Sequence, residues 1–285
     1  MNKVPICVII LTHNEEANLP YALDSVVGWA QQVFVVDSYS TDKTVEIARE
    51  YNARVFQNKW VDYATQRQWA LTSLPIEVEW ILFMDADESL TRSLKDEISR
   101  RIFGERNIDG FFIKRKFIFL GKWVKYGSCK SNRELRLARK ESLCISETRG
   151  SFESYSVKGA TAVLDNYMLH EDRRGIGEWI NKHNKYSSLN SEFIVNGFSY
   201  RKVSRVKAIL GSSKKFDRTF LKEILLFTSH GLWKPFVLFF YRYIIQFGFL
   251  DGKKGFIYHF LHDFWYPLLI EAKVIELLNR QENVD

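Results

Sequence analysis

Apolar residues in the first hundred positions form two alternating patterns. Short continuous apolar runs, rich in β-branched residues, predict strands that are covered on both faces. Between these runs, apolar residues recur at helical spacing and predict amphipathic helices. The predicted strands are Val4–Leu11, Gln32–Asp37, Arg54–Phe56 and Trp80–Met84. A first helix is predicted to open at Asn14–Leu19, and two others are predicted at Thr44–Tyr51 and Tyr63–Leu74. This alternation predicts an α/β fold with a doubly wound, mixed but mostly parallel sheet.

After residue 104 the pattern is less regular. It predicts three further strands and a helix, at Gly110–Phe119, Arg133–Ala138, Lys158–Val163 and Ile176–Leu189. From Phe216 the chain is rich in large apolar residues and is predicted to be helical. We therefore expect a first domain of residues 1–200, in halves of about 1–103 and 104–200, and a C-terminal helical extension of residues 201–285.

Polar residues gather where the first two predicted strands end. Thr12, Asn14 and Glu15 follow the first strand, and Asp37 and Ser38 close the second. In a doubly wound sheet, ligands bind at the carboxyl ends of the strands, so we expect these side chains to meet in one crevice. There Asp37 can accept a hydrogen bond from a base imide or a ribose hydroxyl. The alternative is that these polar residues only cap helices.

A pair of acids, Asp85 and Asp87, flanks Ala86 at the end of the fourth predicted strand. Side chains two residues apart in an extended segment point to the same side. Two carboxylates in this position suit a hard divalent cation that also binds a diphosphate. The alternative is that the acids cap a helix or lie in a solvated turn.

The composition narrows the class of partner. The net charge is +7 and the isoelectric point is about 9.1, which favours anionic partners such as nucleotide phosphates, acidic lipids or acidic glycans. We expect no nucleic acid partner, because the chain has no clustered Lys/Arg motif of a DNA- or RNA-binding module. Three scattered cysteines and the absence of a signal peptide indicate a reduced, cytosolic chain.

Three segments of the first half resemble the family 2 glycosyltransferases. Val8–Glu15 looks like the opening strand of that family. Asp37–Thr44 resembles its Asp-Ser-Gly-Ser-Thr-Asp-Gly-Thr turn, with Tyr39 and Lys43 in place of two glycines. Asp85–Glu88 is similar to its Asp-x-Asp motif. The order and the separations match along residues 4–88, and the resemblance implies a GT-A-like fold.

Later segments resemble the lipopolysaccharide-core β-glucosyltransferase branch of this family. They are Lys114–Gly127, Arg136–Leu137, Phe152–Glu153, Gly159, Leu169–His170 and Phe249–Gly255. The chain departs from the branch at Phe152, where the branch has a histidine, and at Ser128–Asn132, which replace an aromatic-rich loop. Both departures lie where acceptor contacts are expected, so the identity of the acceptor stays open.

The resemblance implies inverting transfer from a nucleoside-diphosphate sugar. An acceptor hydroxyl attacks the anomeric carbon and therefore needs a general base. The diphosphate that leaves needs its growing charge neutralised by Mn²⁺ or Mg²⁺, or by fixed cations. The expected donor is a UDP-sugar, with UDP-glucose preferred. The expected acceptor is a lipid-linked saccharide such as the lipopolysaccharide core.

The resemblance also implies roles for individual residues. Glu153 matches the family's glutamate and is expected to be the general base, with Glu147 and Asp165 as competitors. Asp87 is expected to be a direct metal ligand, while Asp85 binds the ribose or reaches the metal through water. At the matching position, His170 completes the metal shell or contacts the diphosphate; alternatively, it is a core histidine.

Three further residues are candidates for substrate contacts. Arg67 lies in a segment that resembles the family's Gln-Arg-Asn helix, and it is expected to face the diphosphate or to hold one acid of the pair. Arg136 is a candidate for an ion pair near the acceptor, and Trp123 for stacking on an acceptor sugar. The alternatives are a solvated helix face for Arg67 and a structural role for Trp123.

The tail contains a strongly apolar segment, Trp233–Phe249, followed by a second candidate helix at Phe256–Leu278. Lys234, Arg242 and Gln246 interrupt the first segment, which argues against a membrane span. Large aromatic residues with nearby basic residues favour a helix at the membrane surface. We therefore expect a cytoplasmic protein that is peripheral on the cytoplasmic face of the inner membrane, whereas the alternative is that both helices pack on the catalytic domain.

Two other functions compete with a glycosyltransferase. A nucleotidyltransferase would also use an acid pair and a metal, but it would normally have a Gly- and Arg/Lys-rich nucleotide loop near the N-terminus, which Thr12–Glu15 lacks. A scaffold that binds a nucleotide sugar or a membrane without catalysis is the third possibility. The intact acid pair argues against a scaffold.

Overall fold

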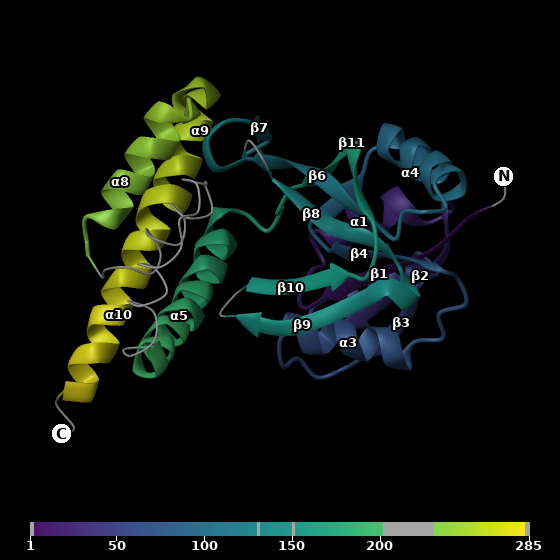
Figure 1. Ribbon diagram of the computed structural model, residues 1–285, viewed down its shortest axis with the longest axis horizontal. Helices are drawn as coiled ribbons and strands as arrows, with labels where there is room; N and C mark the ends of the chain where they lie inside the picture. Colours follow the sequence, from purple (N-terminus) through teal and green to yellow (C-terminus); the bar gives the residue numbers. More distant parts are fainter. Residues whose placement is uncertain (1–2, 130–131, 150–151, 202–230, 283–285) are drawn as a thin grey trace. The chain divides into compact units, whose positions relative to one another are not determined.

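The computed structural model describes residues 3–129, 132–149, 152–201 and 231–282 (Figure 1). Within these ranges, side chains are described except at residues 146–149, 152–155 and 197–201. The chain divides into two compact units: the first contains most of the residues up to Ile176, and the second most of those from Gly177, together with Tyr126–Ser128. This division falls earlier than residue 200, and the assignment of residues 1–200 and 201–285 to two domains stays a prediction.

The first unit is built from strands and four helices in its described part. The strands are β1 Val4–Thr12, β2 Ala30–Asp37, β3 Arg54–Gln57, β4 Trp80–Asp85, β5 Glu88–Leu90, β6 Gly110–Phe119, β7 Lys122–Val124, β8 Arg133–Arg139, β9 Leu143–Arg149, β10 Phe152–Val157 and β11 Thr161–His170. The helices are α1 Leu19–Val26, α2 Thr44–Glu50, α3 Tyr63–Ser73 and α4 Arg92–Gly104. Six predicted strands, from β1 to β4 together with β6 and β8, are confirmed within two residues at each end.

The main sheet has the strand order β3-β2-β1-β4-β8-β6-β11-β5, with β7 paired to β6 (Figure 1). β1 runs parallel to β2 and β4, β2 is parallel to β3, and β6 is parallel to β11. β8 is antiparallel to both β4 and β6 and therefore joins the two parallel blocks. β9 and β10 form a separate two-stranded sheet. The predicted α/β fold class with a mixed sheet is confirmed.

Helices cover the sheet on both faces, as the two-sided apolar runs predicted. Along β1, Val8 and Ile10 pack in the core beneath α1, α2 and α4, whereas Cys7 and Ile9 pack with α3 on the opposite face. Each of these strand side chains has no solvent exposure. Since successive side chains of a strand point to opposite faces, a continuous apolar run can supply both core layers. This is why the sequence pattern located the central strands accurately.

Three predictions about element boundaries are wrong. The helix predicted to end at Leu189 continues as α5, Ile176–Arg201. The predicted strand Lys158–Val163 starts too early, because Gly159 has a φ of +128° and lies in the turn before β11. Asp109 closes this turn by accepting a hydrogen bond from the Ala160 amide at 3.2 Å. The first predicted helix begins at Leu19 rather than near Asn14, whose φ of +55° is left-handed and breaks a helix.

The second unit is helical in its described part, which confirms the helices predicted within Trp233–Phe249 and Phe256–Leu278. The helices are α5 Ile176–Arg201, α8 Lys234–Phe240, α9 Gly252–His259 and α10 Tyr266–Glu282, with π-helical segments at Tyr241–Ile245 and Phe260–Trp265. The helix predicted from Phe216 to residue 230 lies outside the described residues. None of the helices in the described ranges combines the length and apolar character needed to cross a membrane.

A buried carboxylate organises this second unit. Asp263 has no solvent exposure and interacts with His259 Nδ1 at 2.7 Å, His262 Nδ1 at 2.8 Å and Arg242 Nη1 at 2.6 Å. Burial disfavours the charged carboxylate, but the hydrogen bonds from both histidines and the charge of Arg242 outweigh it and hold the pKa of Asp263 well below its ordinary value. The ionised form therefore stabilises the folded state.

We expect Asp263→Asn to lower the free energy of unfolding at pH 7 by about 3 kcal/mol, because it removes one partner of a buried ion pair. A carboxyl group with a depressed folded-state pKa stabilises the protein above its unfolded pKa of about 3.9, and this contribution is lost as the pH falls. The wild type should therefore lose stability more steeply than Asp263→Asn below pH 4. Urea unfolding followed by circular dichroism measures both effects, with the exposed Asp96→Asn as control. Equal pH slopes for the wild type and Asp263→Asn would contradict this account.

Candidate functional site

The first two polar clusters meet where β1 and β2 end. Thr12 and Asp37 are paired residues of these strands, and Thr12 Oγ1 donates to Asp37 Oδ1 at 3.1 Å. Asp37 Oδ2 accepts from the Ser40 amide at 3.0 Å and from Gln57 Nε2 at 3.3 Å. Asp37 has no solvent exposure, so in this structure its carboxylate holds the turn that follows β2. Its predicted contact with a base or a ribose stays a prediction.

The remaining residues of these clusters connect the same loops. Asn14 Oδ1 accepts from the Thr41 amide at 2.8 Å. Ser38 is buried, and its hydroxyl accepts from Gln66 Nε2 at 3.1 Å. The convergence of the two clusters at one edge of the sheet therefore follows the prediction from strand ends.

Asp85, the first acid of the predicted pair, is held by two arginines. Arg136 Nη2 donates to Asp85 Oδ2, and Arg67 Nη2 lies 3.3 Å from Asp85 Oδ1. Arg67 has no solvent exposure and its guanidinium lies over the ring of Phe83, 4.8 Å from its centroid. Burial opposes the charge of Asp85, but Arg136 and then Arg67 outweigh it and keep its pKa well below the ordinary value. Of the two expected roles of Arg67, the structure shows the one in which it holds an acid.

Glu88 joins this network from the start of β5. Its Oε1 lies 2.8 Å from Arg136 Nη2 and 3.4 Å from Arg115 Nη1, while its Oε2 accepts from the Asp85 amide at 3.0 Å. Glu88 and Arg136 are almost completely buried. Burial opposes ionisation of Glu88, yet the charge of Arg136 lowers its pKa despite the neighbouring Asp85. Arg136 therefore connects two acids of one motif.

Asp87, the second acid of the pair, faces His170 instead. The distance from Asp87 Oδ2 to His170 Nε2 is 3.6 Å, and Asp87 is 5% exposed. The imidazole stacks at an angle on Phe117, and its Nδ1 lies 3.7 Å from Glu88 Oε1. Burial disfavours the charged ring, but Asp87 and Glu88 outweigh it and raise the pKa of His170. A cation bound here would compete with the proton on this ring.

These residues fit a divalent cation that shares its shell with a diphosphate. Mg²⁺ is commonly bound by one or two protein groups plus substrate phosphates, with bonds of about 2.1 Å. Two ligands of such an ion lie between about 3 Å and about 4.2 Å apart. The 3.6 Å between Asp87 Oδ2 and His170 Nε2 falls within this range. Among the residues that the structure describes, no cluster of three His, Cys, Asp or Glu side chains could hold a metal by itself.

Trp123 is not brought to this group of residues. It is paired with Ile118, and its ring contacts Lys116 and Tyr167, with Lys116 Nζ 4.5 Å from the ring centroid. His170 is paired with Phe117, the residue between Lys116 and Ile118 on β6. Adjacent strand residues point to opposite faces, so Trp123 and His170 lie on opposite faces of the sheet.

The candidates for the general base differ in what the structure describes. Asp165 is an exposed residue of β11 whose carboxylate lies 3.5 Å from Lys114 Nζ. Glu147 lies on β9 and Glu153 on β10, and the side chains of both lie outside the described residues. The assignment of the base to Glu153 stays a prediction.

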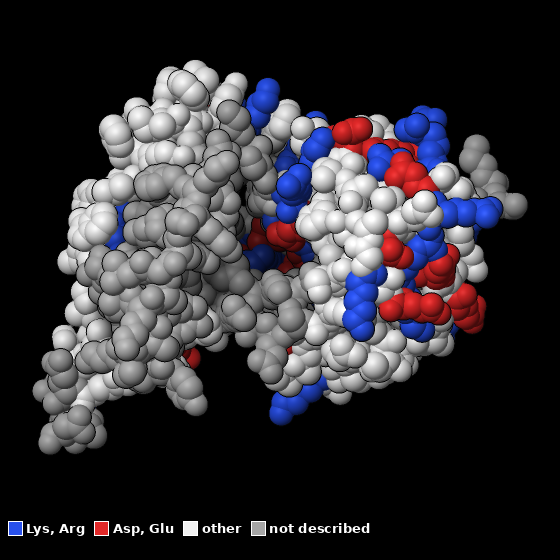
Figure 2. Space-filling model, in the orientation of Figure 1, with Lys and Arg blue, Asp and Glu red and all other residues white. Residues whose placement is uncertain are grey.

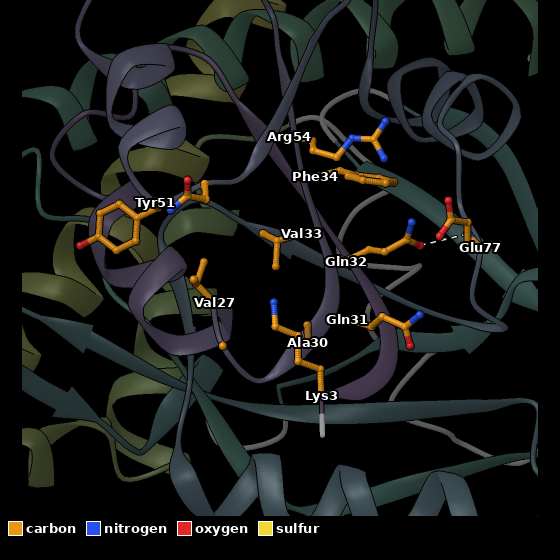
Figure 3. Close-up of a pocket in the computed structure, with 12 residues that line it drawn as sticks. Lys3, Val27, Ala30, Gln31, Gln32, Val33, Phe34, Tyr51, Arg54 and Glu77 are labelled. Atoms are coloured by element: carbon orange, nitrogen blue, oxygen red, sulfur yellow. Dashed lines mark hydrogen bonds between the residues drawn. The ribbon is translucent and has the colours of Figure 1, made fainter. Parts of the chain in front are cut away.

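A separate cavity of about 460 Å³ lies at the other end of the strands (Figure 3). It is lined by the start of β2, by the residues that follow α2 and by the first residue of β3, including Ala30, Gln32, Tyr51 and Arg54. Gln32 Oε1 accepts from the Glu77 amide at 3.0 Å at its edge. None of the predicted site residues lines this cavity, and ligands of doubly wound sheets bind at the opposite, carboxyl ends of the strands.

Sequence analysis missed the partners of the predicted residues. Glu88 and Arg115 lie inside segments that were already singled out, but no local pattern indicates that Glu88, Arg115 and Arg136 meet. Asn18 and Arg174 were also missed. Both contact the predicted site residue Glu15, and Arg174 Nη1 lies 2.9 Å from Glu15 Oε1. These contacts join residues that are far apart in the sequence, so only the folded chain reveals them.

Residues 7–147 match the family described as glycosyl transferase family 2. An uncharacterized glycosyltransferase of Rickettsia typhi is 30% identical over 98% of this chain and 89% of its own length. LpsC of Rhizobium meliloti, a lipopolysaccharide core biosynthesis glycosyltransferase, is 26% identical over 91% of this chain and 90% of its own. Glucosyl-3-phosphoglycerate synthase from Mycobacterium tuberculosis aligns with a TM-score of 0.46 and 16% identity, covering 67% of this chain and 79% of that one.

We expect Arg136→Met to lower the free energy of unfolding by about 3 kcal/mol, because it leaves the buried Glu88 and the partly exposed Asp85 without their shared cation. Urea denaturation of the full chain measures the change. Arg280→Met, at a residue whose side chain is 72% exposed, is the matched control and should cost less than about 0.5 kcal/mol. Equal effects of the two substitutions would show that the network around Arg136 does not stabilise the fold.

Proposed function

The chain belongs to the family 2 glycosyltransferases, and we propose that it transfers a sugar from a UDP-sugar, preferably UDP-glucose, to a hydroxyl of a lipid-linked saccharide. The observation that carries this proposal is the pairing of Asp87 with His170 beside Asp85, where two strands end. Similarity to LpsC supports the lipopolysaccharide core as the class of acceptor. The proposed reaction inverts the configuration at the anomeric carbon.

Asp87 and His170 are the proposed ligands of Mn²⁺ or Mg²⁺. When bound, the cation neutralises charge on the diphosphate as the bond to the sugar breaks. Asp87 is buried and lies opposite the imidazole, so both groups are oriented before any ligand arrives. Phe117 supports the ring of His170 from one side.

Asp85 has a different proposed role from Asp87. Its carboxylate is already bound by Arg67 and Arg136, so little of its charge is left for direct coordination of a cation. We assign Asp85 to the ribose or to a water-mediated contact with the cation, beside the backbone of Ala86. The low pKa of Asp85 keeps the carboxylate ionised for this hydrogen bonding.

The donor nucleotide is proposed to bind at the ends of β1 and β2, at Thr12, Asn14, Glu15, Asp37 and Ser38. Glu153 is proposed to accept the proton of the attacking acceptor hydroxyl. Phosphate leaving groups are anions, so transfer needs no general acid. One base together with charge neutralisation of the diphosphate is therefore sufficient for the reaction.

We expect Asp87→Asn to abolish metal-dependent release of UDP, because an amide oxygen is a weaker ligand than a carboxylate and leaves the cation less neutralised. The assay measures UDP released from a panel of UDP-sugars by the detergent-solubilised full chain, with and without Mn²⁺ or Mg²⁺. A decrease of at least about a hundredfold is expected for UDP-glucose, which is the order of effect for loss of one charge-stabilising group.

The exposed Asp96→Asn makes the same chemical change on α4 and is the matched control, with UDP release expected to match the wild type. Glu153→Gln should retain metal-dependent UDP binding while losing transfer. Transfer that survives both Asp87→Asn and Glu153→Gln would overturn the proposed function.

We also propose that the second unit binds the surface of the inner membrane from its cytoplasmic side. Phe236, Phe240 and Ile244 are spaced by four residues and are 59%, 57% and 41% exposed. Lys253 and Lys254 are exposed nearby in the sequence. The end of this unit that carries α8 and α9 is mostly uncharged in Figure 2. An exposed apolar stripe with adjacent basic residues suits a membrane interface.

We expect the double substitution Phe236→Ser and Phe240→Ser to weaken binding to vesicles that contain anionic phospholipid by about tenfold or more, because each buried phenyl ring contributes about 1.5–3 kcal/mol. Vesicle co-sedimentation measures the binding. Phe103→Ser, at a residue of α4 that is 65% exposed, is the matched control. Undiminished vesicle binding of the double variant, with unchanged helical content, would exclude this surface.

A further inference from the structure

Asn18 occupies the N-cap position of α1, but its side chain does not cap the helix. Asparagine is among the preferred N-cap residues, because its side-chain oxygen usually accepts from an amide in the first turn. Here the side chain has no solvent exposure and makes no such bond. A fully buried amide that is not used for capping must be satisfied elsewhere.

The hydrogen bonds of Asn18 connect two segments that are more than 150 positions apart. Its Nδ2 donates to Glu15 Oε2 at 2.7 Å and to Asp172 Oδ1 at 3.1 Å. Its Oδ1 accepts from the Arg173 amide at 2.7 Å. The side chain thus uses both ends of its amide, and it ties the loop between β1 and α1 to the loop that follows β11.

The loop that follows β11 is also attached to the proposed metal ligands. It begins directly after His170, and the Glu171 amide donates to the backbone oxygen of Asp87 at 2.8 Å. Further along the loop, Arg174 Nη2 lies 2.6 Å from Asp172 Oδ2, and Arg174 Nη1 lies 2.9 Å from Glu15 Oε1. Asn18 therefore lies at the junction of the segment carrying Asp87, the segment carrying His170 and the first nucleotide loop.

We propose that Asn18 is a positioning residue for the metal-dependent part of the donor site. It holds the loop of residues 171–174 against the β1–α1 loop and so keeps His170 opposite Asp87. This inference rests on the proposed function, because it assigns the two residues to a cation that binds a nucleoside diphosphate. Asn18 itself contacts no substrate in this proposal.

The chemistry of the junction explains the need for an amide at this position. Glu15 and Asp172 present two carboxylates to Nδ2, and the Arg173 amide presents a donor to Oδ1. Only a side chain with a donor and an acceptor on one planar group satisfies both sides. An aspartate has the same shape, but it would place a third carboxylate against Glu15 and Asp172, in a buried setting where repulsion is strong.

The loops of the proposed nucleotide site are held by hydrogen bonds of their own. Thr12, Asp37 and Ser40 are connected by hydrogen bonds among themselves, and none of these bonds involves Asn18. Glu15, the nucleotide-site residue that accepts from Asn18, is also bound by Arg174 and therefore keeps a partner when Asn18 is changed. Disturbing Asn18 should therefore weaken the contribution of the metal to UDP binding more than it weakens binding of UDP alone. A purely structural role would not make this distinction.

The test is calorimetric measurement of UDP binding to the full chain, once with Mn²⁺ and once with EDTA. We expect Asn18→Asp to weaken binding with Mn²⁺ about tenfold, and binding with EDTA by less than about twofold. The melting temperature is recorded in parallel. Asn52→Asp, at an exposed turn residue, makes the same chemical change as a matched control and should leave both affinities unchanged.

A rescue variant tests the hydrogen bond itself. Combining Asn18→Asp with Asp172→Asn exchanges donor and acceptor between the two positions and restores the formal charge of the wild type. We expect this double variant to recover part of the lost affinity in Mn²⁺, because the exchange restores the contact between positions 18 and 172 while Glu15 still faces a carboxylate. If Asn18→Asp does not fold, the same measurement on Asp172→Asn alone tests the junction, because it removes a partner of Asn18 and of Arg174.

The outcomes separate the two proposals. If the wild type binds UDP no better with Mn²⁺ than with EDTA, the proposed function fails and this inference fails with it. If the wild type shows metal-dependent binding that Asn18→Asp and Asp172→Asn leave intact, only the role of Asn18 is excluded. Equal losses with Mn²⁺ and EDTA, or a loss that the exchange does not rescue, would also exclude it.

Discussion

The buried interaction of Arg136 with Asp85 and Glu88 is the constraint on which the site depends. Burying a guanidinium and a carboxylate, with a second carboxylate only partly exposed, is costly unless each charge is compensated. Arg67 and Arg115 supply the remaining positive charge, so two acids of one short motif can stay ionised inside the fold. Arg136 binds both Asp85 and Glu88, whereas Asp87 lies opposite Nε2 of His170.

The mixed sheet is what brings these charges together. β8 runs antiparallel between β4 and β6, and this places Arg136 beside the end of β4, where Asp85 lies. β11 pairs with β5 and so brings His170 next to the segment that carries Glu88. The loop after β11 then returns to Asn18. Several separate parts of the chain contribute to one cluster, and a fully parallel sheet without β8 would not supply Arg136.

Sequence predictions were accurate where the pattern involves only neighbouring residues, and less accurate where the structure depends on contacts between distant residues. The strands β1, β2 and β4 were located well, because a continuous apolar run is a local property that directly reflects burial on both faces. The strand predicted at Lys158–Val163 was misplaced, because Gly159 lies in a turn that Asp109 closes by accepting from the Ala160 amide, 51 positions away. Asp85, Asp87 and His170 were singled out by motif and resemblance, and the structure brings them together. Trp123 was singled out in the same way, but it lies on the other face of the sheet from His170.

The class of fold, the central strands and the short polar motifs at their ends follow from residue periodicity and residue type, which act over a few neighbouring positions. The pairing of charges depends on the tertiary structure. The folded chain places Asp85 against Arg136 and Asp87 opposite His170. Arg136 is 51 positions from Asp85, and Asn18 is 154 from Asp172. Pairings over such separations depend on strand order and register, and burial makes them strong enough to set the roles of the individual residues.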